Sequence, residues 1–243
     1  MKENKYDDDQ FFNKYGEMNR SKYGLSGAGE WSKLQKILPN FKNKRVLDLG
    51  CGYGWHCKYA VENGASHVLG TDISHKMLEV AKEINSDVNI TYQCSAMEDL
   101  SFPEETFDII LSSLAFHYIK DFNKLVQEIT KWIKIGGEIV FSVEHPVFTS
   151  YGTQDWFYDE NGNILHFPVD NYYYEGKREA VFLGEIITKY HRTLTTYLNT
   201  LLQNGFQLQH IIEPQPPKEM LDIEGMRDEM RRPMMLLVSA KKI

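Results

Sequence analysis

The residues best suited to chemistry begin with a glycine-rich turn. Gly50, Gly52 and Gly54 alternate with other residues directly after the apolar run Val46–Leu49, and a segment with helical apolar spacing follows. A strand, a glycine turn and a helix in this order bring backbone N–H groups close to a ligand. Glycine permits a positive φ there, and a Cβ would hold the ligand away from the main chain.

The spacing of the glycines and an acidic neighbour indicate what the turn binds. A dinucleotide site reads G-x-G-x-x-G and binds a pyrophosphate, whereas this turn reads G-x-G-x-G. Asp48 precedes the first glycine by two positions. Its carboxylate would repel a pyrophosphate but could accept hydrogen bonds from an ammonium group. A cationic amino-acid moiety therefore suits the turn better, and a turn that only packs strand against helix is the alternative.

A second carboxylate ends the next apolar run, His67–Asp72. Asp72 follows the last glycine of the turn, Gly54, at close to the spacing of about 20 residues at which an acidic residue holds ribose hydroxyls. It could instead cap the helix expected at His75–Ile84, as Ser74 could, but the glycine turn upstream favours ribose binding. Met77 in that helix belongs either to the core or to an adenine site.

The elements that must position these residues alternate between strand and helix. Strands are expected at Val46–Leu49, His67–Asp72, Asn89–Cys94, Phe107–Ser113 and Glu138–Val143, with helices at His75–Ile84 and Phe122–Ile133 and a glycine helix stop at Gly136. This alternation implies a parallel sheet with right-handed crossovers, whose ligands lie beyond the carboxyl ends of the strands. The segments that converge on that edge are Gly50–Gly54, Asp72, Ser95–Glu98 and Ser112–His117.

The second half adds an insertion and a closing pair of strands. Val147–Tyr190 is rich in aromatic residues and is interpreted as antiparallel strands that cover the binding edge. Its rings form a core of this cap, a dimer surface or a substrate pocket. A helix over Thr193–Leu202 precedes an antiparallel pair, Phe206–Glu213 and Met234–Ala240. We predict an α/β fold with a doubly wound, mostly parallel seven-stranded sheet, an antiparallel last strand and a β-rich cap.

The N-terminal segment is interpreted as helical. The acidic run Asp7–Asp9 is expected to be solvated and frayed, and Phe11 begins a stripe of apolar residues at helical spacing. Such a helix either packs on the sheet or forms a lid, and Tyr15 and Arg20 are its polar candidates for the site. We expect one domain, with a lid in residues 1–40, a core in 41–146 and 193–243, and a cap in 147–192.

Composition limits the class of protein. The 243 residues carry a formal charge of −7, which argues against a nucleic-acid binder that needs a basic face. The chain holds Cys51, Cys57 and Cys94, and neither zinc nor disulfide spacing relates them, so a reducing cytoplasm is expected. No apolar stretch reaches the roughly 18 residues of a membrane span. His166 and His210 lack metal-ligand spacing to any partner, so no metal site is predicted.

The motifs together resemble one known family. The stretches VLDLGCGYG, GTDIS, SAMEDLSF, FDIILSSLAFHYI and IGGEIVFSV resemble the class I S-adenosylmethionine-dependent methyltransferases, most closely their small-molecule type 11 or UbiE-like group, over Val46–Val143. The resemblance implies S-adenosyl-L-methionine as cofactor. It places the methionine moiety against Asp48, Gly50, Cys51, Gly52 and Gly54, the ribose on Asp72, and the adenine beside Ile73. Ala96, followed by Met97, occupies the position that meets the adenine amine in the family. The resemblance places the sulfonium beside Ser113 and Leu114.

The implied reaction transfers a methyl group to an O, N or C atom of a small molecule. We expect it to take place in the cytoplasm, without a nucleic-acid or membrane partner. A homodimer is possible. Because the donor is already activated, the protein mainly aligns the acceptor and excludes water. The candidates for catalysis are His145, His117, His191 and Tyr172, and His145 is the first choice because it leaves a strand at the binding edge. A nicotinamide-dependent oxidoreductase, a non-catalytic cofactor-binding module and, less favoured, an RNA methyltransferase are the alternatives.

Overall fold

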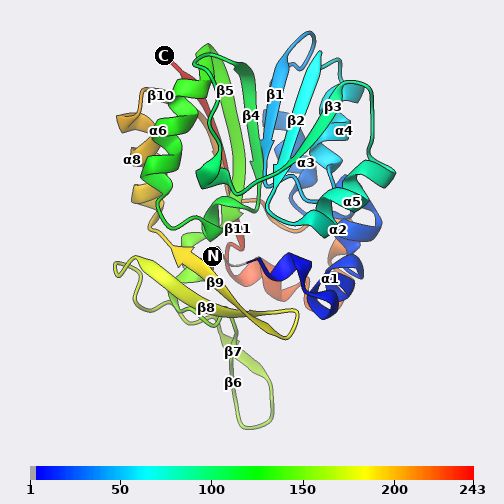
Figure 1. The fold of residues 1–243 in the computed structure, drawn as a ribbon. Helices are drawn as coiled ribbons and strands as arrows, with labels where there is room; N and C mark the ends of the chain where they lie inside the picture. The colour runs from blue at the N-terminus through cyan, green and yellow to red at the C-terminus, as the bar shows by residue number, and fades with distance from the viewer. Residues whose placement is uncertain (1–3) are drawn as a thin grey trace.

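A seven-stranded sheet forms the centre of the computed structural model, which describes residues 4–243 (Figure 1). The strands are β1 (Arg45–Leu49), β2 (His67–Asp72), β3 (Ile90–Cys94), β4 (Phe107–Ser113), β5 (Ile133–Glu144), β10 (Phe206–Ile212) and β11 (Met235–Lys242). Their order is β10-β11-β5-β4-β1-β2-β3. β11 runs antiparallel to both of its neighbours, and the remaining neighbouring strands pair in parallel. This sheet confirms the predicted fold class.

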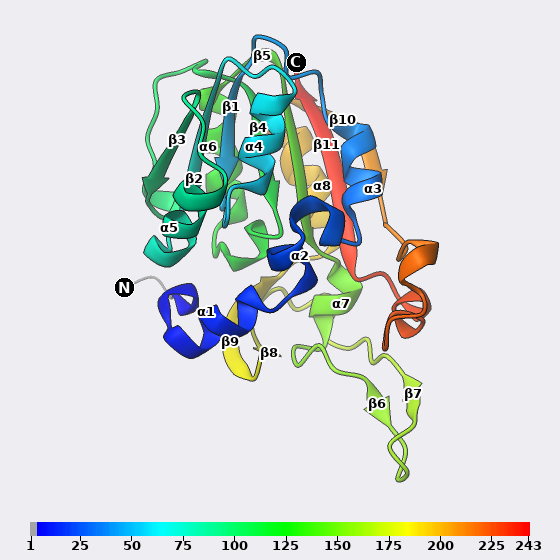
Figure 2. The same ribbon diagram turned by 90° about the vertical axis from the view of Figure 1, so that its right-hand side faces the viewer.

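Helices cover both faces of the sheet (Figures 1 and 2). They are α3 (Trp31–Leu34), α4 (Trp55–Glu62), α5 (His75–Ile84), α6 (Phe122–Trp132) and α8 (Leu194–Gln203). Successive strand residues point to opposite faces, so Leu47 packs with the side chains of α6 and α8. Val46 packs with those of α3, α4 and α5. Burial on both faces explains why the central strands β1 and β4 read as largely apolar runs in the sequence.

One predicted boundary is wrong. The helix expected to reach a stop at Gly136 ends at Trp132, and β5 begins at Ile133, whose backbone is extended. Gly136 has a φ of 78° inside the strand, where the pairing of β4 with β5 shifts register. Gly136 and the following Gly137 therefore accommodate a β-bulge in β5 rather than ending a helix.

The N-terminal segment docks on the body of the protein. It consists of η1 (Lys5–Asp7), α1 (Asp9–Gly16), α2 (Asn19–Lys22), η2 (Gly24–Gly27), α3 and η3 (Gln35–Ile37). The predicted helix at Phe11 is confirmed, but the expectation of a frayed Asp7 is wrong. Its Oδ1 accepts hydrogen bonds from Ser74 Oγ at 2.6 Å and from the Lys76 amide at 3.1 Å. A carboxylate at the N-terminus of α5 also interacts favourably with the helix dipole.

The insertion contains α7 (Pro146–Ser150), β6 (Phe157–Tyr158), β7 (Ile164–His166), β8 (Gly176–Phe182) and β9 (Glu185–His191). As Figures 1 and 2 show, the antiparallel β8–β9 hairpin lies near α1, whereas the β6–β7 hairpin projects from the body. Phe148 stacks on Phe167, with ring centroids 5.7 Å apart. The guanidinium of Arg232, beyond η6 (Lys218–Met220) and η7 (Asp228–Arg231), lies 4.5 Å from the Phe148 centroid. These rings pack within the insertion and against the C-terminal segment.

Within residues 4–243, no helix combines the length and the apolar character that crossing a membrane requires.

Candidate active site

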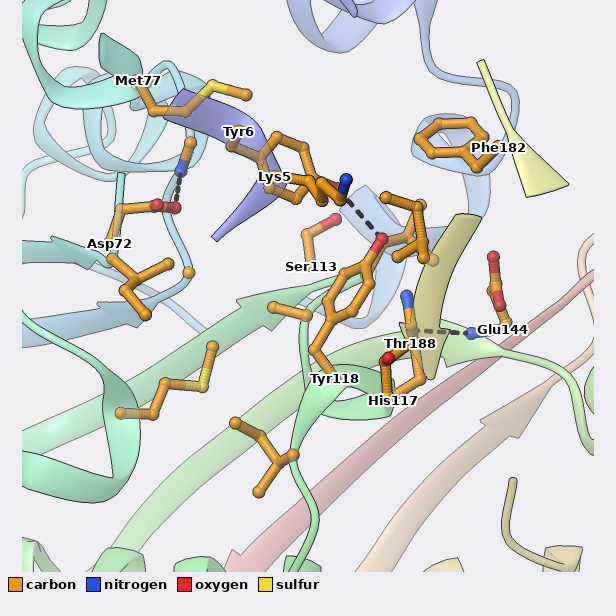
Figure 3. A pocket seen from close by; sticks show the side chains of 18 of the residues that line it. Lys5, Tyr6, Asp72, Met77, Ser113, His117, Tyr118, Glu144, Phe182 and Thr188 are labelled. Carbon is orange, nitrogen blue, oxygen red and sulfur yellow. Dashed lines mark hydrogen bonds between the residues drawn. The ribbon is translucent and has the colours of Figure 1, made fainter. Parts of the chain in front are cut away.

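A cavity of about 650 Å³ lies at the carboxyl ends of the central strands. The strand order reverses between β4 and β1, and a ligand crevice is expected at such a reversal. The N-terminal segment and the β8–β9 hairpin close it from outside (Figure 3). The predicted site residues that line it are Tyr15, Arg20, Gly50, Gly52, Asp72, Ile73, Met77, Ala96, Met97, Ser113, Leu114 and His117.

The glycine turn forms one wall of the cavity from backbone. The amides of Gly50 and Cys51 donate to the Thr71 carbonyl at 2.8 and 2.9 Å, which fixes the turn to β2. Gly50 has a φ of 75°, and a Cβ there would lie 2.5 Å from Ala115 Cβ. Gly52 has a φ of 52°, and no atom lies within 4 Å of where its Cβ would be. A side chain at Gly52 would therefore occupy the space of the cavity.

Asp72 presents its carboxylate to the same cavity (Figure 3). Its Oδ2 accepts from the Gly52 amide and its Oδ1 from the Ser74 amide, both at 2.9 Å. Each oxygen keeps a further lone pair for a ligand hydroxyl. Burial raises the pKa of Asp72 against the opposing effect of these hydrogen bonds. The cap of α5 is Ser74, whose Oγ accepts from the Met77 amide at 3.1 Å.

Three residues of the predicted methionine site lie outside the cavity lining. Asp48 is 1% exposed and accepts from Cys57 Sγ at 3.3 Å, and burial raises its pKa to about 7. Cys51 is also buried. Gly54 begins α4 with a φ of 76°, and a Cβ there would lie 2.2 Å from Tyr92 Oη. These residues shape the turn from beneath, because the Asp48 side chain points toward α4 rather than toward the strand ends.

The exit of β4 carries a strained residue. Leu114 has a φ of 52°, a left-handed conformation that costs a non-glycine residue about 1–2 kcal/mol. Its amide donates to the carbonyl and to Oγ of Ser142, at 2.9 and 3.0 Å. Ser113 Oγ lies 3.2 Å from Ser142 Oγ. The two predicted residues thus form a rigid corner of the cavity, held by the neighbouring strand β5.

His117 is the predicted catalytic candidate that the structure brings to the cavity. Its Nδ1 accepts from the Glu144 amide at 3.4 Å, which places the proton of the neutral ring on Nε2. Burial lowers the pKa of His117 to about 4, against the opposing charge of Glu144. Glu144 also lines the cavity, and its carboxylate accepts from Lys189 Nζ and Gln154 Nε2, both at 2.6 Å. Burial would raise the pKa of Glu144, but His117 and Lys189 lower it overall.

The other candidates have structural partners instead and do not line the cavity. His145, the first choice from sequence, caps α7 by accepting from the Val147 amide at 3.1 Å. Its Nε2 lies 2.8 Å from Glu213 Oε1. The chain turns into α7 directly after β5, which carries this ring away from the strand ends. His191 lies 2.7 Å from Thr149 Oγ1 and 2.9 Å from the carbonyl of Tyr172.

Sequence reasoning missed part of the wall. Tyr6 and Tyr118 line the cavity with their hydroxyls 2.9 Å apart (Figure 3), and Phe182 of β8 lines it as well. Tyr118 directly follows His117, so the exit of β4 carried a signal for it. Tyr6 adjoins the acidic run that was expected to be frayed, and its position depends on the docking of Asp7. The aromatic residues of the first part of the insertion, residues 151–174, are not among those that line this cavity.

Comparison with known proteins identifies the family. A family model described as "Methyltransferase domain" matches residues 47–141. The crystal structure of an S-adenosylmethionine-dependent methyltransferase from Mesorhizobium loti is 40% identical, with a TM-score of 0.82 over 90% of this chain and 100% of that one. The chain belongs to the S-adenosylmethionine-dependent methyltransferases.

Further relatives agree with this assignment. A Listeria monocytogenes protein described as such a methyltransferase is 52% identical, with a TM-score of 0.86 over 90% of this chain and 99% of that one. The ubiquinone biosynthesis O-methyltransferase of Coxiella burnetii is 34% identical over 51% of this chain and 58% of that protein. Membership of this family excludes the alternative of a nicotinamide-dependent oxidoreductase. Across residues 4–243, no group of three or more His, Cys, Asp or Glu side chains is arranged to hold a metal ion in this methyltransferase.

Proposed function

We propose that this methyltransferase binds S-adenosylmethionine between the glycine turn and Asp72 and methylates a small molecule held in the rest of the cavity. The observation that carries the proposal is the pairing of a backbone cradle at Gly52, which a Cβ would fill, with the Asp72 carboxylate in the same cavity. The open space at Gly52 lets a ligand approach the backbone closely. The Asp72 carboxylate can accept hydrogen bonds from two neighbouring hydroxyls. We propose residues 4–40 as a lid and β8–β9 as the part of the cap that closes the site.

The remaining cofactor contacts follow from the positions around this pair. Tyr15 and Arg20 line the cavity from the N-terminal segment, and the guanidinium suits the carboxylate of the methionine moiety. Ile73, Met77, Ala96 and Met97 supply an apolar wall that suits the adenine ring. Ser113 and Leu114 would border the sulfonium.

The acceptor would lie against the other side of the cavity. Tyr6, Tyr118 and Phe182 give that side an aromatic wall. Lys5, Lys120 and Lys177 also line it, in a protein with a formal charge of −7. Glu185 lies 3.7 Å from Lys5 and Glu179 2.8 Å from Lys177, so each of these carboxylates offsets part of the positive charge. These contacts favour a small acceptor with an apolar body and an acidic group.

Bound S-adenosylmethionine supplies a methyl group already activated on the sulfonium, so the residues of the chain align the acceptor and exclude water. His117 is neutral, so its Nε2–H group would be available to orient an acceptor oxygen. The His117 ring is a weak base because its pKa is about 4. The Glu144 carboxylate is also a weak base because its pKa is lowered. We therefore propose an acceptor atom that needs no deprotonation by the protein at neutral pH.

Calorimetric titration with S-adenosylmethionine and S-adenosylhomocysteine tests the proposal. Both should bind, and Asp72→Asn should weaken each by about ten- to a hundredfold, because a charged acceptor of hydrogen bonds is lost. Binding without methyl transfer to any member of a panel of small organic acids would favour the non-catalytic module. Absence of both heat and thermal shift would refute the proposed site.

A further inference from the structure

A buried carboxylate outside the cavity holds a guanidinium that lines it. Glu30 is 3% exposed, and its Oε1 lies 2.5 Å from Nη2 of Arg20. We propose that Glu30 is a positioning residue, which orients Arg20 to bind the carboxylate of the methionine moiety of the cofactor. The inference rests on the cofactor site proposed above and extends it to a residue that does not line the cavity.

The local fold brings the two residues together across a tight connection. Arg20 belongs to α2, and Glu30 immediately precedes α3, where its side chain makes no capping hydrogen bond to that helix. Gly24 has a φ of 59° and packs against the ring of Trp55. Gly27 approaches α2 so closely that a Cβ would lie 2.2 Å from the carbonyl oxygen of Asn19. The glycines thus return the chain onto α2, and the Glu30 carboxylate is directed at Arg20 rather than used as a helix cap.

The energetics of this ion pair point to a role other than stability. Burying two charges costs several kcal/mol per ion, and apolar residues of similar volume often stabilise a protein as well or better. The second oxygen of Glu30, Oε2, is buried and has no hydrogen-bond partner in residues 4–243. The pair is therefore incompletely compensated by its surroundings. Such a carboxylate is explained if its charge fixes a guanidinium whose other side serves a ligand.

The surroundings of Arg20 leave the guanidinium available to the cavity. A guanidinium has five N–H donors in a planar fork, and within the described residues Glu30 is the hydrogen-bond acceptor of Arg20. Burial lowers the pKa of the neighbouring His56 to about 4, and the charge of Arg20 contributes to this. The imidazole is thus neutral and does not compete with Arg20 for an anion. Burial would lower the pKa of Arg20, but Glu30 and Tyr15 raise it.

The test separates the amino-acid end of the ligand from its nucleoside end. S-adenosylhomocysteine carries the carboxylate, whereas methylthioadenosine has the same nucleoside without the amino-acid moiety. We expect calorimetry to show that Glu30→Gln weakens the binding of S-adenosylhomocysteine about tenfold, because the charge-assisted hydrogen bond from Arg20 to the ligand carboxylate is misplaced. Methylthioadenosine should bind the variant within about twofold of the wild type.

A second pair of variants shows whether Glu30 acts through Arg20. In the Arg20→Gln background, adding Glu30→Gln should cause no further loss of S-adenosylhomocysteine affinity, because the two residues act on one contact. Glu30→Asp keeps the charge but withdraws it by one methylene. It should also weaken S-adenosylhomocysteine selectively, and it takes the place of Glu30→Gln if that variant does not fold.

The outcomes are distinct. Equal losses for both ligands would make Glu30 a residue of general folding, and unchanged affinity for both would remove it from the site; either result overturns the inference. If the wild type bound neither ligand, the proposed cofactor site itself would fail. Thermal unfolding of each unliganded variant measures its stability, so that a selective loss of S-adenosylhomocysteine affinity can be distinguished from a loss of folding.

Discussion

Asp48 lies beneath the glycine turn, and its burial should make the stability of the methyltransferase depend on pH. Its pKa is about 7 in the folded chain and about 3.9 in an unfolded one. Between these values the folded state holds a proton that the unfolded state has released. Stability therefore falls as pH rises through this window, and the loss is complete above it. With 1.36 kcal/mol per pKa unit, the full loss is about 4 kcal/mol.

Asp48→Asn removes this titration. The amide oxygen can still accept from Cys57 Sγ, whereas the buried NH₂ group lacks partners, at a cost of about 1–3 kcal/mol that does not vary with pH. The constant cost cancels when two pH values are compared. The free energy of unfolding of the variant minus that of the wild type should therefore rise by about 3 kcal/mol from pH 5 to pH 8.

Urea unfolding followed by circular dichroism at pH 5, 6, 7 and 8 measures this difference. Asp108→Asn is the matched control. Burial would raise the pKa of Asp108, but hydrogen bonds from the Arg45 amide at 2.9 Å and Lys134 Nζ at 3.0 Å lower it. Asp108 is thus ionised in both states above pH 5, and its loss should destabilise the protein equally at every pH. A flat difference for Asp48→Asn beside the expected control would refute the burial argument.

Three further predictions concern the site and its surroundings. Gly52→Ala should weaken S-adenosylhomocysteine at least about tenfold in calorimetry, because the Cβ enters the cavity. Gly162→Ala, at a φ of 81° in equally open space, should leave that affinity unchanged. Asp7→Asn should speed limited trypsin cleavage of the N-terminal segment, since the Ser74 hydroxyl loses a charged acceptor; an unchanged rate would contradict the docking. His145→Gln should cost about 1 kcal/mol of unfolding free energy through the lost cap and leave cofactor affinity intact; a large affinity loss would return His145 to the site.

The central fold could be predicted because its signals are local. The central strands β1 and β4 are buried on both faces and therefore appear as largely apolar runs, and the turn after Leu49 is marked by glycines. The bulge at Gly136 could not be distinguished from a helix stop, because glycine is suited to both. The pairing of β4 with β5 determines that Gly136 lies in a strand, and this pairing cannot be inferred from the residues next to Gly136.

The residues of the cavity that follow strands were predictable for a related reason. Gly52, Asp72 and Leu114 follow directly from strands, so their place at one sheet edge is fixed by topology. Glu30 and Tyr6 come from irregular segments whose positions depend on contacts between residues distant in sequence. No periodic pattern in the sequence predicts where their side chains lie. His145 was misplaced because a single residue beyond a strand decides whether a side chain faces the cavity or begins the next helix.

The loop after β2 anchors the N-terminal segment as well as presenting Asp72 to the cavity, so closure of the cavity depends on this loop. The Ser74 amide donates to Asp72, and its hydroxyl donates to Asp7. Asn4 Nδ2 also donates to the carbonyl of Ile73, at 3.3 Å. A ligand that fixes the Asp72 carboxylate therefore also fixes the groups on which the N-terminal segment docks. Since the Tyr6 hydroxyl of that segment lies against the Tyr118 hydroxyl, the aromatic wall of the cavity is assembled through the same loop that is proposed to hold the ribose.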